Sequence, residues 1–396
     1  MIRVCLSRCL NLIPFLLIPL SLLGCPPGSK PPEPVSTVKA CNGTKPCFLT
    51  KKGTGSVQEA QAYYNTLDPN PVKKTTFDRW YVENGFSDPL PAEFAQAVYF
   101  NNGDLQIGRD MHCRRSLLGV PALRVACYVT NYGPEPGTST YPDEATALTD
   151  AVAAQNPTAV KNLFATVAME YVGQTIFGLG SPPQVDFYVF DKLGQRINAA
   201  ALDSEGPKAI PQMCMACHGG TYDPQTHRVT GASFLPFDVF SFHYSTTQGY
   251  TQSDQEEQFR KLNAMVKLMN TRPAIVEMID AMYPQGVGNQ GSIASDTQVP
   301  TGWSSQSNLY KNFLTPYCRG CHVASATFPF RTYQEFKNLA PIIRADVCRA
   351  HSMPHAEVPF KRIWTPALGI LLSPMVLDDS NVLPAPTGPP DAKCLS

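Results

Sequence analysis

Two short segments of this 396-residue chain share one pattern, in which two cysteines three positions apart are followed directly by a histidine. The segments are residues 214–218 (CMACH) and 318–322 (CRGCH). On one helical turn the two thiols lie on the same side and can bond to the two vinyl groups of one porphyrin, while the histidine faces its iron. Chance would give only roughly 0.01 such segments in a chain of this composition. The pattern therefore predicts two covalently bound haem c groups.

The attachment residues follow from the pattern, and they are Cys214, Cys217, Cys318 and Cys321. His218 and His322 are the predicted proximal ligands of the two irons, each with its second ring nitrogen held by a carbonyl group. A tetrahedral zinc cluster of the four thiols is the alternative. It would leave both histidines without a role, so we favour haem.

The distal ligand of the second haem is predicted to be Met353. A thioether in this position raises the reduction potential of the iron, and Pro354 stiffens the loop that presents it. His351 and His355 flank Met353 and are the rival ligands.

For the first haem, His112 is the favoured distal ligand, because it follows a predicted strand hairpin and precedes Cys113. A bis-histidine iron of this kind would have a lower potential than its neighbour. Other candidates stay open, and so does a histidine without a role; they are Met111, His227 and His243. Three nearby arginines are either partners of the haem propionates or part of a solvated basic turn, and they are Arg109, Arg114 and Arg115.

Residues 1–24 are predicted to be a signal peptide, with Arg3 and Arg8 at a basic start and an apolar run over residues 10–23. That run is shorter than the roughly 20 residues a membrane-spanning helix needs. Residues 22–25 (LLGC) resemble the lipobox of bacterial lipoproteins. The resemblance implies a lipid on Cys25 and, with Pro26 after it, the periplasmic side of the outer membrane. An ordinary secretory peptide is the alternative, and proline-rich residues 25–57 read as a tether.

Cysteine usage also indicates export. Of the 13 cysteines, two lie in the signal peptide, one is the lipidation site and four belong to the haem segments. The six that are left form three disulfides in an oxidising compartment. Sequence alone leaves fifteen pairings open, and we expect the nearest-neighbour ones: Cys41–Cys47, Cys113–Cys127 and Cys348–Cys394.

The first haem segment lies in a predicted α+β domain over residues 58–290. Asn102-Gly103 between two apolar runs predicts a β-hairpin, and further strands are expected at residues 125–129, 185–190 and 196–197. Amphipathic spacing predicts a helix over residues 255–269, and Pro273 is expected to open the next one. Both helices carry methionines that we interpret as core residues.

Residues 305–396 are predicted to form a small all-α domain. Apolar spacing before Cys318, the haem segment and then Met353-Pro354 occur in the order seen in the class I cytochrome c domain, which this region resembles. The resemblance implies electron transfer to and from periplasmic redox proteins. Bacterial dihaem peroxidases also carry two such segments, so a haem enzyme is the alternative. With 32 basic against 32 acidic residues and no basic run, nothing indicates nucleic-acid binding.

Overall fold

A computed structural model describes most of the chain between residues 55 and 359. The described ranges are 55–68, 74–89, 91–117, 122–133, 144–155, 163–175, 183–203, 206–270, 272–297, 299–343, 353 and 356–359. All of them lie within one compact unit of the chain. The signal peptide, the lipid anchor at Cys25, the disulfides Cys41–Cys47 and Cys348–Cys394, and the rival ligands His351 and His355 fall outside these ranges.

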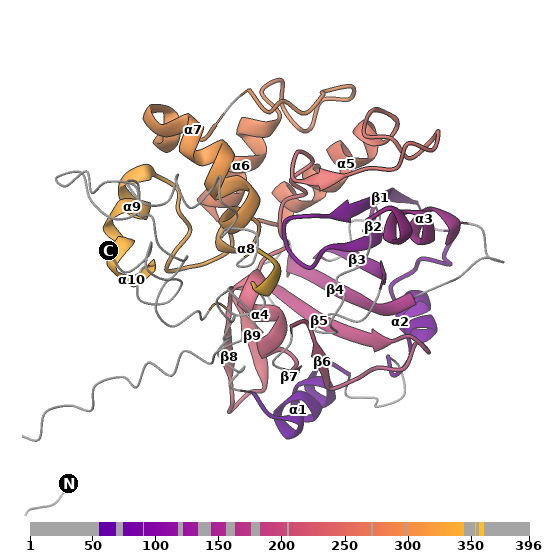
Figure 1. Ribbon diagram of the computed structural model, residues 1–396. Helices are drawn as coiled ribbons and strands as arrows, with labels where there is room; N and C mark the ends of the chain where they lie inside the picture. Colours follow the sequence, from indigo (N-terminus) through magenta and orange to yellow (C-terminus); the bar gives the residue numbers. More distant parts are fainter. Residues whose placement is uncertain are drawn as a thin grey trace, which may run out of the picture. The chain divides into compact units, whose positions relative to one another are not determined.

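A six-stranded antiparallel sheet is the main element of the N-terminal region (Figure 1). Its strand order is β10-β1-β2-β3-β4-β5. The strands are β1 (Ala92–Asn101), β2 (Ile107–Ser116), β3 (Ala122–Tyr132), β4 (Leu163–Thr175), β5 (Gln184–Asp191) and β10 (Phe242–His243). Two small ladders pair β6 (Ala199–Ala201) with β7 (Pro207–Ala209) and β8 (Thr221–Asp223) with β9 (Arg228–Thr230).

The helices of the N-terminal region are α1 (Val57–Leu67), α2 (Phe77–Glu83), α3 (Glu144–Ala153) and α4 (Gln212–His218). The later α-helices are α5 (Glu256–Met269), α6 (Pro273–Met282), α7 (Ser307–Leu309), α8 (Gly320–His322), α9 (Tyr333–Asn338) and α10 (Ala340–Ile343). Two 3₁₀ turns, η1 (Ser253–Gln255) and η2 (Thr301–Gln306), and a π-helix, η3 (Tyr310–Arg319), complete the described part. None of these helices combines the length and apolar character needed to cross a bilayer.

The two faces of the sheet have different neighbours. On one face, α2 packs the ring of Phe77 at 5.0 Å from Tyr128, and His112 stacks on the same tyrosine at 4.6 Å. Because side chains alternate along a strand, Met111 points to the other face. That face is turned toward the two CxxCH segments. The alternation thus decides which β2 residues can meet a bound cofactor.

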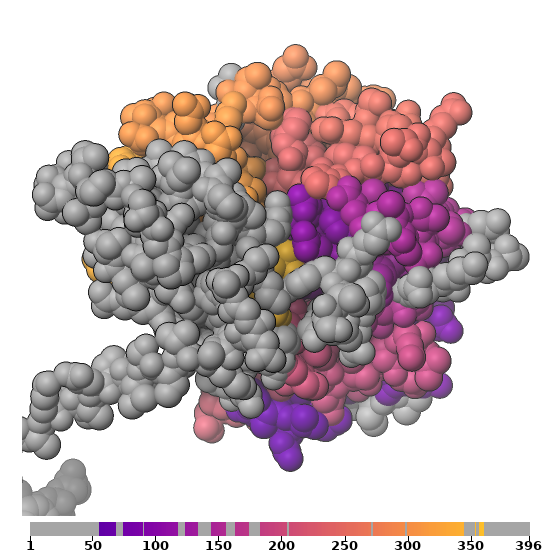
Figure 2. Space-filling model, viewed as in Figure 1, coloured from indigo at the N-terminus to yellow at the C-terminus, as the bar shows by residue number. Residues whose placement is uncertain are grey.

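The helices after the sheet form where the sequence pattern predicts them. The apolar face of α5 is buried, and Pro273 occupies the first turn of α6. Methionines on both helices, Met265 and Met278 among them, are core residues as predicted. In the C-terminal part, the indole of Trp303 donates to the carbonyl oxygen of Phe330 (2.7 Å) at the centre of a small aromatic cluster. Figure 2 shows the orange surface of these C-terminal helices continuous with the salmon surface of α5 and α6.

The mixed α and β content and the antiparallel sheet agree with the predicted fold class. The predicted hairpin is the β1–β2 pair, and the strand predicted at residues 185–190 is β5. The strand predicted at residues 196–197 is wrong, because Arg196 forms only an isolated bridge with Phe190. Strand β4 was not predicted: it lies inside the sheet between β3 and β5, and a covered strand lacks a clear alternation of apolar and polar residues.

A candidate haem-binding cavity

A single cavity of about 600 Å³ lies between the open face of the sheet and both CxxCH segments. Its volume falls within the range of about 300–1,000 Å³ that is typical of cofactor and ligand sites. Apolar side chains of β2 to β5 line one side, among them Met111, Val129, Val167 and Val189. The four cysteines and the two histidines of the CxxCH segments line the cavity as well, and so does Met353. The fold therefore brings together two segments that are 104 residues apart in the sequence.

The first segment lies on α4, a two-turn helix that ends at His218. Its first cysteine, Cys214, is buried, and Gly219 ends the helix with a positive φ of 67°. The Nδ1 of His218 donates to the carbonyl oxygen of Ser233 (2.9 Å). This hydrogen bond assigns the neutral tautomer in which Nε2 carries the lone pair. Burial lowers the pKa of His218 to about 4, so the imidazole is a neutral ligand at pH 7.

The second segment repeats this arrangement at the end of η3 and in α8. Pro316 lies inside η3 and has no N–H to donate, which favours the wider π-helical turn before Cys318. The Nδ1 of His322 donates to the carbonyl oxygen of Phe328 (3.1 Å), and burial lowers the pKa of this imidazole to about 4. The ring of Phe330 stacks on His322 at 4.5 Å. Two segments of different local structure thus present their histidines in the same way.

Arg319 lies between the two cysteines of the second segment, and its side chain connects this segment to Asp238 in the sheet region. The guanidinium of Arg319 donates from Nε to Oδ2 of Asp238 (3.0 Å), and Asp238 also accepts from the hydroxyl of Ser241 (2.8 Å). Arg319 additionally donates to the hydroxyl of Tyr310 (3.0 Å). The residue between the two cysteines is therefore an anchor of the segment.

The interaction with the Cys217 side chain, together with burial, raises the pKa of Cys321 well above its usual value. No group of three His, Cys, Asp or Glu side chains that could hold a metal ion is found in the described ranges. In each segment the two cysteines and the histidine lie within one helical stretch, an arrangement that fits covalent haem attachment.

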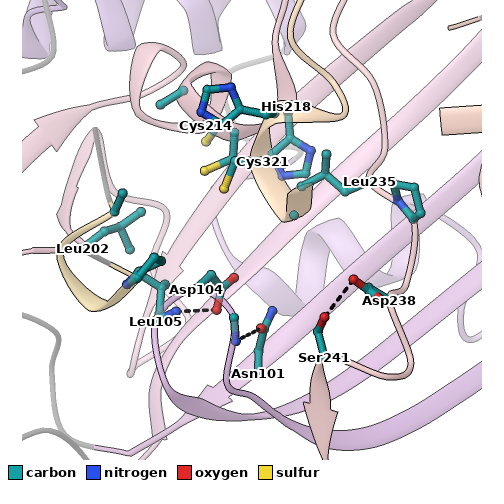
Figure 3. Close-up of a pocket in the computed structure, with 18 of the residues that line it drawn as sticks. Asn101, Asp104, Leu105, Leu202, Cys214, His218, Leu235, Asp238, Ser241 and Cys321 are labelled. Atoms are coloured by element: carbon teal, nitrogen blue, oxygen red, sulfur yellow. Dashed lines mark hydrogen bonds between the residues drawn. The ribbon is translucent and has the colours of Figure 1, made fainter. Parts of the chain in front are cut away.

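Figure 3 shows the cavity from the side of the β1–β2 loop. Cys214, Cys321 and His218 lie at one end, while Asn101, Asp104 and Leu105 approach from the loop. Arg109 at the start of β2 donates from a terminal guanidinium nitrogen to Oδ2 of Asp104 (2.7 Å). The Arg109–Asp104 ion pair and the cysteines thus line the same cavity.

The distal candidates occupy different places. Met353 lines the cavity that holds His322. His112 does not: its Nε2 lies 2.8 Å from Asp110 and its ring stacks on Tyr128, on the face of the sheet covered by α2. Its neighbour Met111 lines the cavity in its place. His112 does not follow the hairpin as expected but lies within β2, on the sheet face that is turned away from the cavity, so its position does not support a distal role.

The remaining candidates are held elsewhere. His227 is 2.9 Å from the hydroxyl of Tyr222 beside the β8–β9 ladder, and His243 is 2.9 Å from Glu144. Of the three arginines, Arg109 lines the cavity, while Arg114 lies over the ring of Phe94 and Arg115 pairs with Glu93. Within the described part, His218 and His322 are thus the histidines that line the cavity.

A disulfide between Cys113 and Cys127 links two neighbouring strands, β2 and β3. This is one of the three predicted pairings. The expectation that a carbonyl group holds each histidine is confirmed. That these are the carbonyls of Ser233 and Phe328 could not be predicted, and neither could the contact between Arg319 and Asp238. Backbone carbonyls leave no trace in a sequence, and the arginine and the aspartate are 81 residues apart.

Comparisons with known proteins leave the site to be interpreted from its own geometry. No family model, no curated protein and no solved structure matches this chain.

Proposed function

We propose that the protein is a dihaem c-type cytochrome that passes single electrons between periplasmic partners. The observation that carries the proposal is that His218 and His322 have the same surroundings. Each is half-buried and neutral, each has Nδ1 bound to a backbone carbonyl, and each lines the same cavity as its own pair of cysteines. A histidine that ligates a metal typically donates its second ring N–H to a carbonyl or carboxylate, which fixes its orientation. A histidine with a purely structural role does not require this arrangement.

The residues have separate tasks in this proposal. Cys214 and Cys217 would hold the first haem, and Cys318 and Cys321 the second. His218 and His322 are oriented as proximal ligands, and Met353 is available on the cavity wall as the distal ligand of the second iron. The bound group supplies one-electron iron chemistry, while the apolar strands exclude water from it.

The C-terminal part, residues 305–396, is proposed to be a cytochrome c-like domain. Short helices surround the second haem segment there, and their core is mostly aromatic. This core consists of Trp303, Leu309, Tyr310, Phe313, Leu314, Phe330 and Phe336. A compact helical shell of this kind suits the burial of one haem.

Export and anchoring are part of the proposal. The disulfide between Cys113 and Cys127 suits an oxidising compartment. We propose that Cys25 carries a lipid that holds the protein at a bacterial membrane, where it meets periplasmic redox proteins. Mass spectrometry of the N-terminal peptide tests this separately from haem binding, because an unmodified Cys25 would leave the haem proposal intact.

The decisive experiment is the mass and absorption spectrum of the mature protein expressed with a haem-attachment system. Two haem masses and a c-type spectrum are expected. The double variant C214A/C217A should retain one haem, and so should C318A/C321A. As a control, C113A/C127A removes the disulfide and should still carry two haems if it folds. A colourless wild-type protein would contradict the proposal.

A haem enzyme is the second candidate function, and one feature of the cavity favours it. Arg109 and Asn131 are cross-strand partners that line the cavity, and each has one buried polar atom, Nε and Oδ1, without a hydrogen-bond partner in the described chain. Such a donor and acceptor can bind a small polar substrate. Rapid carbon monoxide binding by the reduced protein, together with peroxide turnover, would favour the enzyme; neither is expected of an electron carrier with two filled irons.

A further inference from the structure

The two haem segments touch each other. α4 and α8 pack together, and Gly219 lies against the carbonyl oxygen of Ala324. A Cβ atom on Gly219 would overlap that oxygen. In c-type attachment the two cysteines of a segment bond to the vinyl groups of one macrocycle. Two macrocycles held by these segments would therefore be attached to neighbouring helices.

An ion pair lines the same cavity. Arg109 and Asp104 are joined at 2.7 Å, and both line the cavity together with the four cysteines. Their side chains are 14% and 30% exposed, so solvent screens this pair only partly. His218 and His322 line this cavity as well. The pair is thus shared by both haem sites.

We propose that the two haems would form one junction where α4 packs against α8, and that the Arg109–Asp104 pair would set the reduction potential of both. This inference rests on the proposed function. It makes the molecule a two-electron store whose irons exchange electrons directly, and it assigns the tuning of that store to two residues outside the haem segments.

The sign of the tuning follows from electrostatics. A net negative charge near an iron stabilises the ferric state and lowers its potential, and a net positive charge has the opposite effect. For unit charges on the order of 10 Å apart at an effective dielectric constant of about 20, Coulomb's law gives roughly a tenfold change in the equilibrium constant. A tenfold change is 59 mV for a one-electron couple.

The first test is electron paramagnetic resonance of the fully oxidised protein. Wild-type protein should show spin-coupled, broadened ferric signals, whereas C214A/C217A and C318A/C321A should each show one sharp, isolated signal. If the wild-type spectrum equals the sum of the two single-haem spectra, the junction is overturned. The haem count by mass, taken on the same samples, separates this outcome from a failure of the proposed function.

The second test is a redox titration of variants of the pair. R109Q leaves Asp104 unpaired and should lower both potentials by about 59 mV, while D104N leaves Arg109 unpaired and should raise both by a similar amount. The double variant R109Q/D104N should return toward the wild-type values. R115Q is the matched control, because Arg115 is on the same strand and pairs with Glu93 outside the cavity. Shifts confined to one haem, or equal to those of R115Q, would overturn the tuning role.

Discussion

Gly219 is the residue that allows the two haem segments to approach each other. Its φ of 67° and ψ of −162° belong to a region that is almost restricted to glycine, and the Ala324 carbonyl occupies the place of a Cβ. We expect G219A to reduce the free energy of unfolding by roughly 3 kcal/mol or more, from backbone strain and overlap together. Denaturant unfolding measures it.

Gly249 provides a matched control for this substitution. It also has a positive φ, 89°, but no atom lies within 4 Å of the position its Cβ would take. G249A should therefore cost only about 1–2 kcal/mol, the strain of the backbone alone. Equal losses in the two variants would mean that the contact with Ala324 contributes nothing.

Met353 supports a prediction at the same scale. If Met353 is the distal ligand of the second haem, M353A would remove a thioether from its iron, and the methionine absorption band at the red end of the spectrum should disappear. The potential of that haem should fall by on the order of 100 mV, since axial ligands govern haem potentials. M269L alters a buried methionine of α5 that does not line the cavity, and should leave the band in place. Persistence of the band in M353A would assign the ligand elsewhere.

At the scale of elements, strand β5 carries a buried acid. Burial raises the pKa of Asp186 to about 7, and the bond from Gln184 offsets this only in part. Because the folded state holds this proton more tightly than the unfolded chain, the contribution of Asp186 to stability is largest below about pH 4. It is lost as the pH rises through 7, by up to about 4 kcal/mol.

D186N should remove this dependence. The variant is expected to be more stable than wild type at pH 8 by a few kcal/mol, and to match it near pH 4, because the neutral amide mimics the protonated acid. Urea unfolding at a series of pH values provides the measurement. Parallel curves for the two proteins would show that Asp186 ionises normally.

Individual elements also show how far the sequence predicts this fold. The β1–β2 hairpin, α5 and the start of α6 follow from local signals: an Asn-Gly turn, a helical apolar stripe and a proline at the first helical position. β4 has no such local signal, because its position depends on pairing with β3 and β5 on either side. His112 shows the same limit, because local signals do not fix the register of β2. A shift of one residue moves a side chain to the other face of the sheet.

Haem attachment stays a prediction, but the two CxxCH segments and their histidines could be identified in the sequence because their spacing is local. The shared cavity could not, since nothing local indicates that residues 214–218 and 318–322 meet. The Arg109–Asp104 pair could be predicted only in part. The sequence offers Arg109 as a possible partner of a haem propionate, but its bond to Asp104 depends on the shape of the β1–β2 loop.

At the scale of the whole molecule, the bond between Arg319 and Asp238 joins the second haem segment to the sheet region. Both side chains are largely buried, at 13% and 7% exposure. D238N would leave the arginine charge buried without a counter-charge, so we expect a loss of about 3–5 kcal/mol in the free energy of unfolding.

The exposed pair between Lys267 and Asp280 is the control, with side chains 34% and 50% exposed. D280N should change the stability by no more than about 1 kcal/mol, because solvent screens a surface pair. Comparable losses in D238N and D280N would indicate that the two regions are held together by other contacts.

The shared cavity also dictates an order of assembly. Its walls come from segments 104 residues apart, and burial raises the pKa of the Cys214 and Cys318 thiols to about 12, which leaves them unreactive once the chain has closed around them. If the proposed haems are attached, the macrocycles would have to be delivered before the polypeptide folds, and their attachment would commit the chain to its final shape.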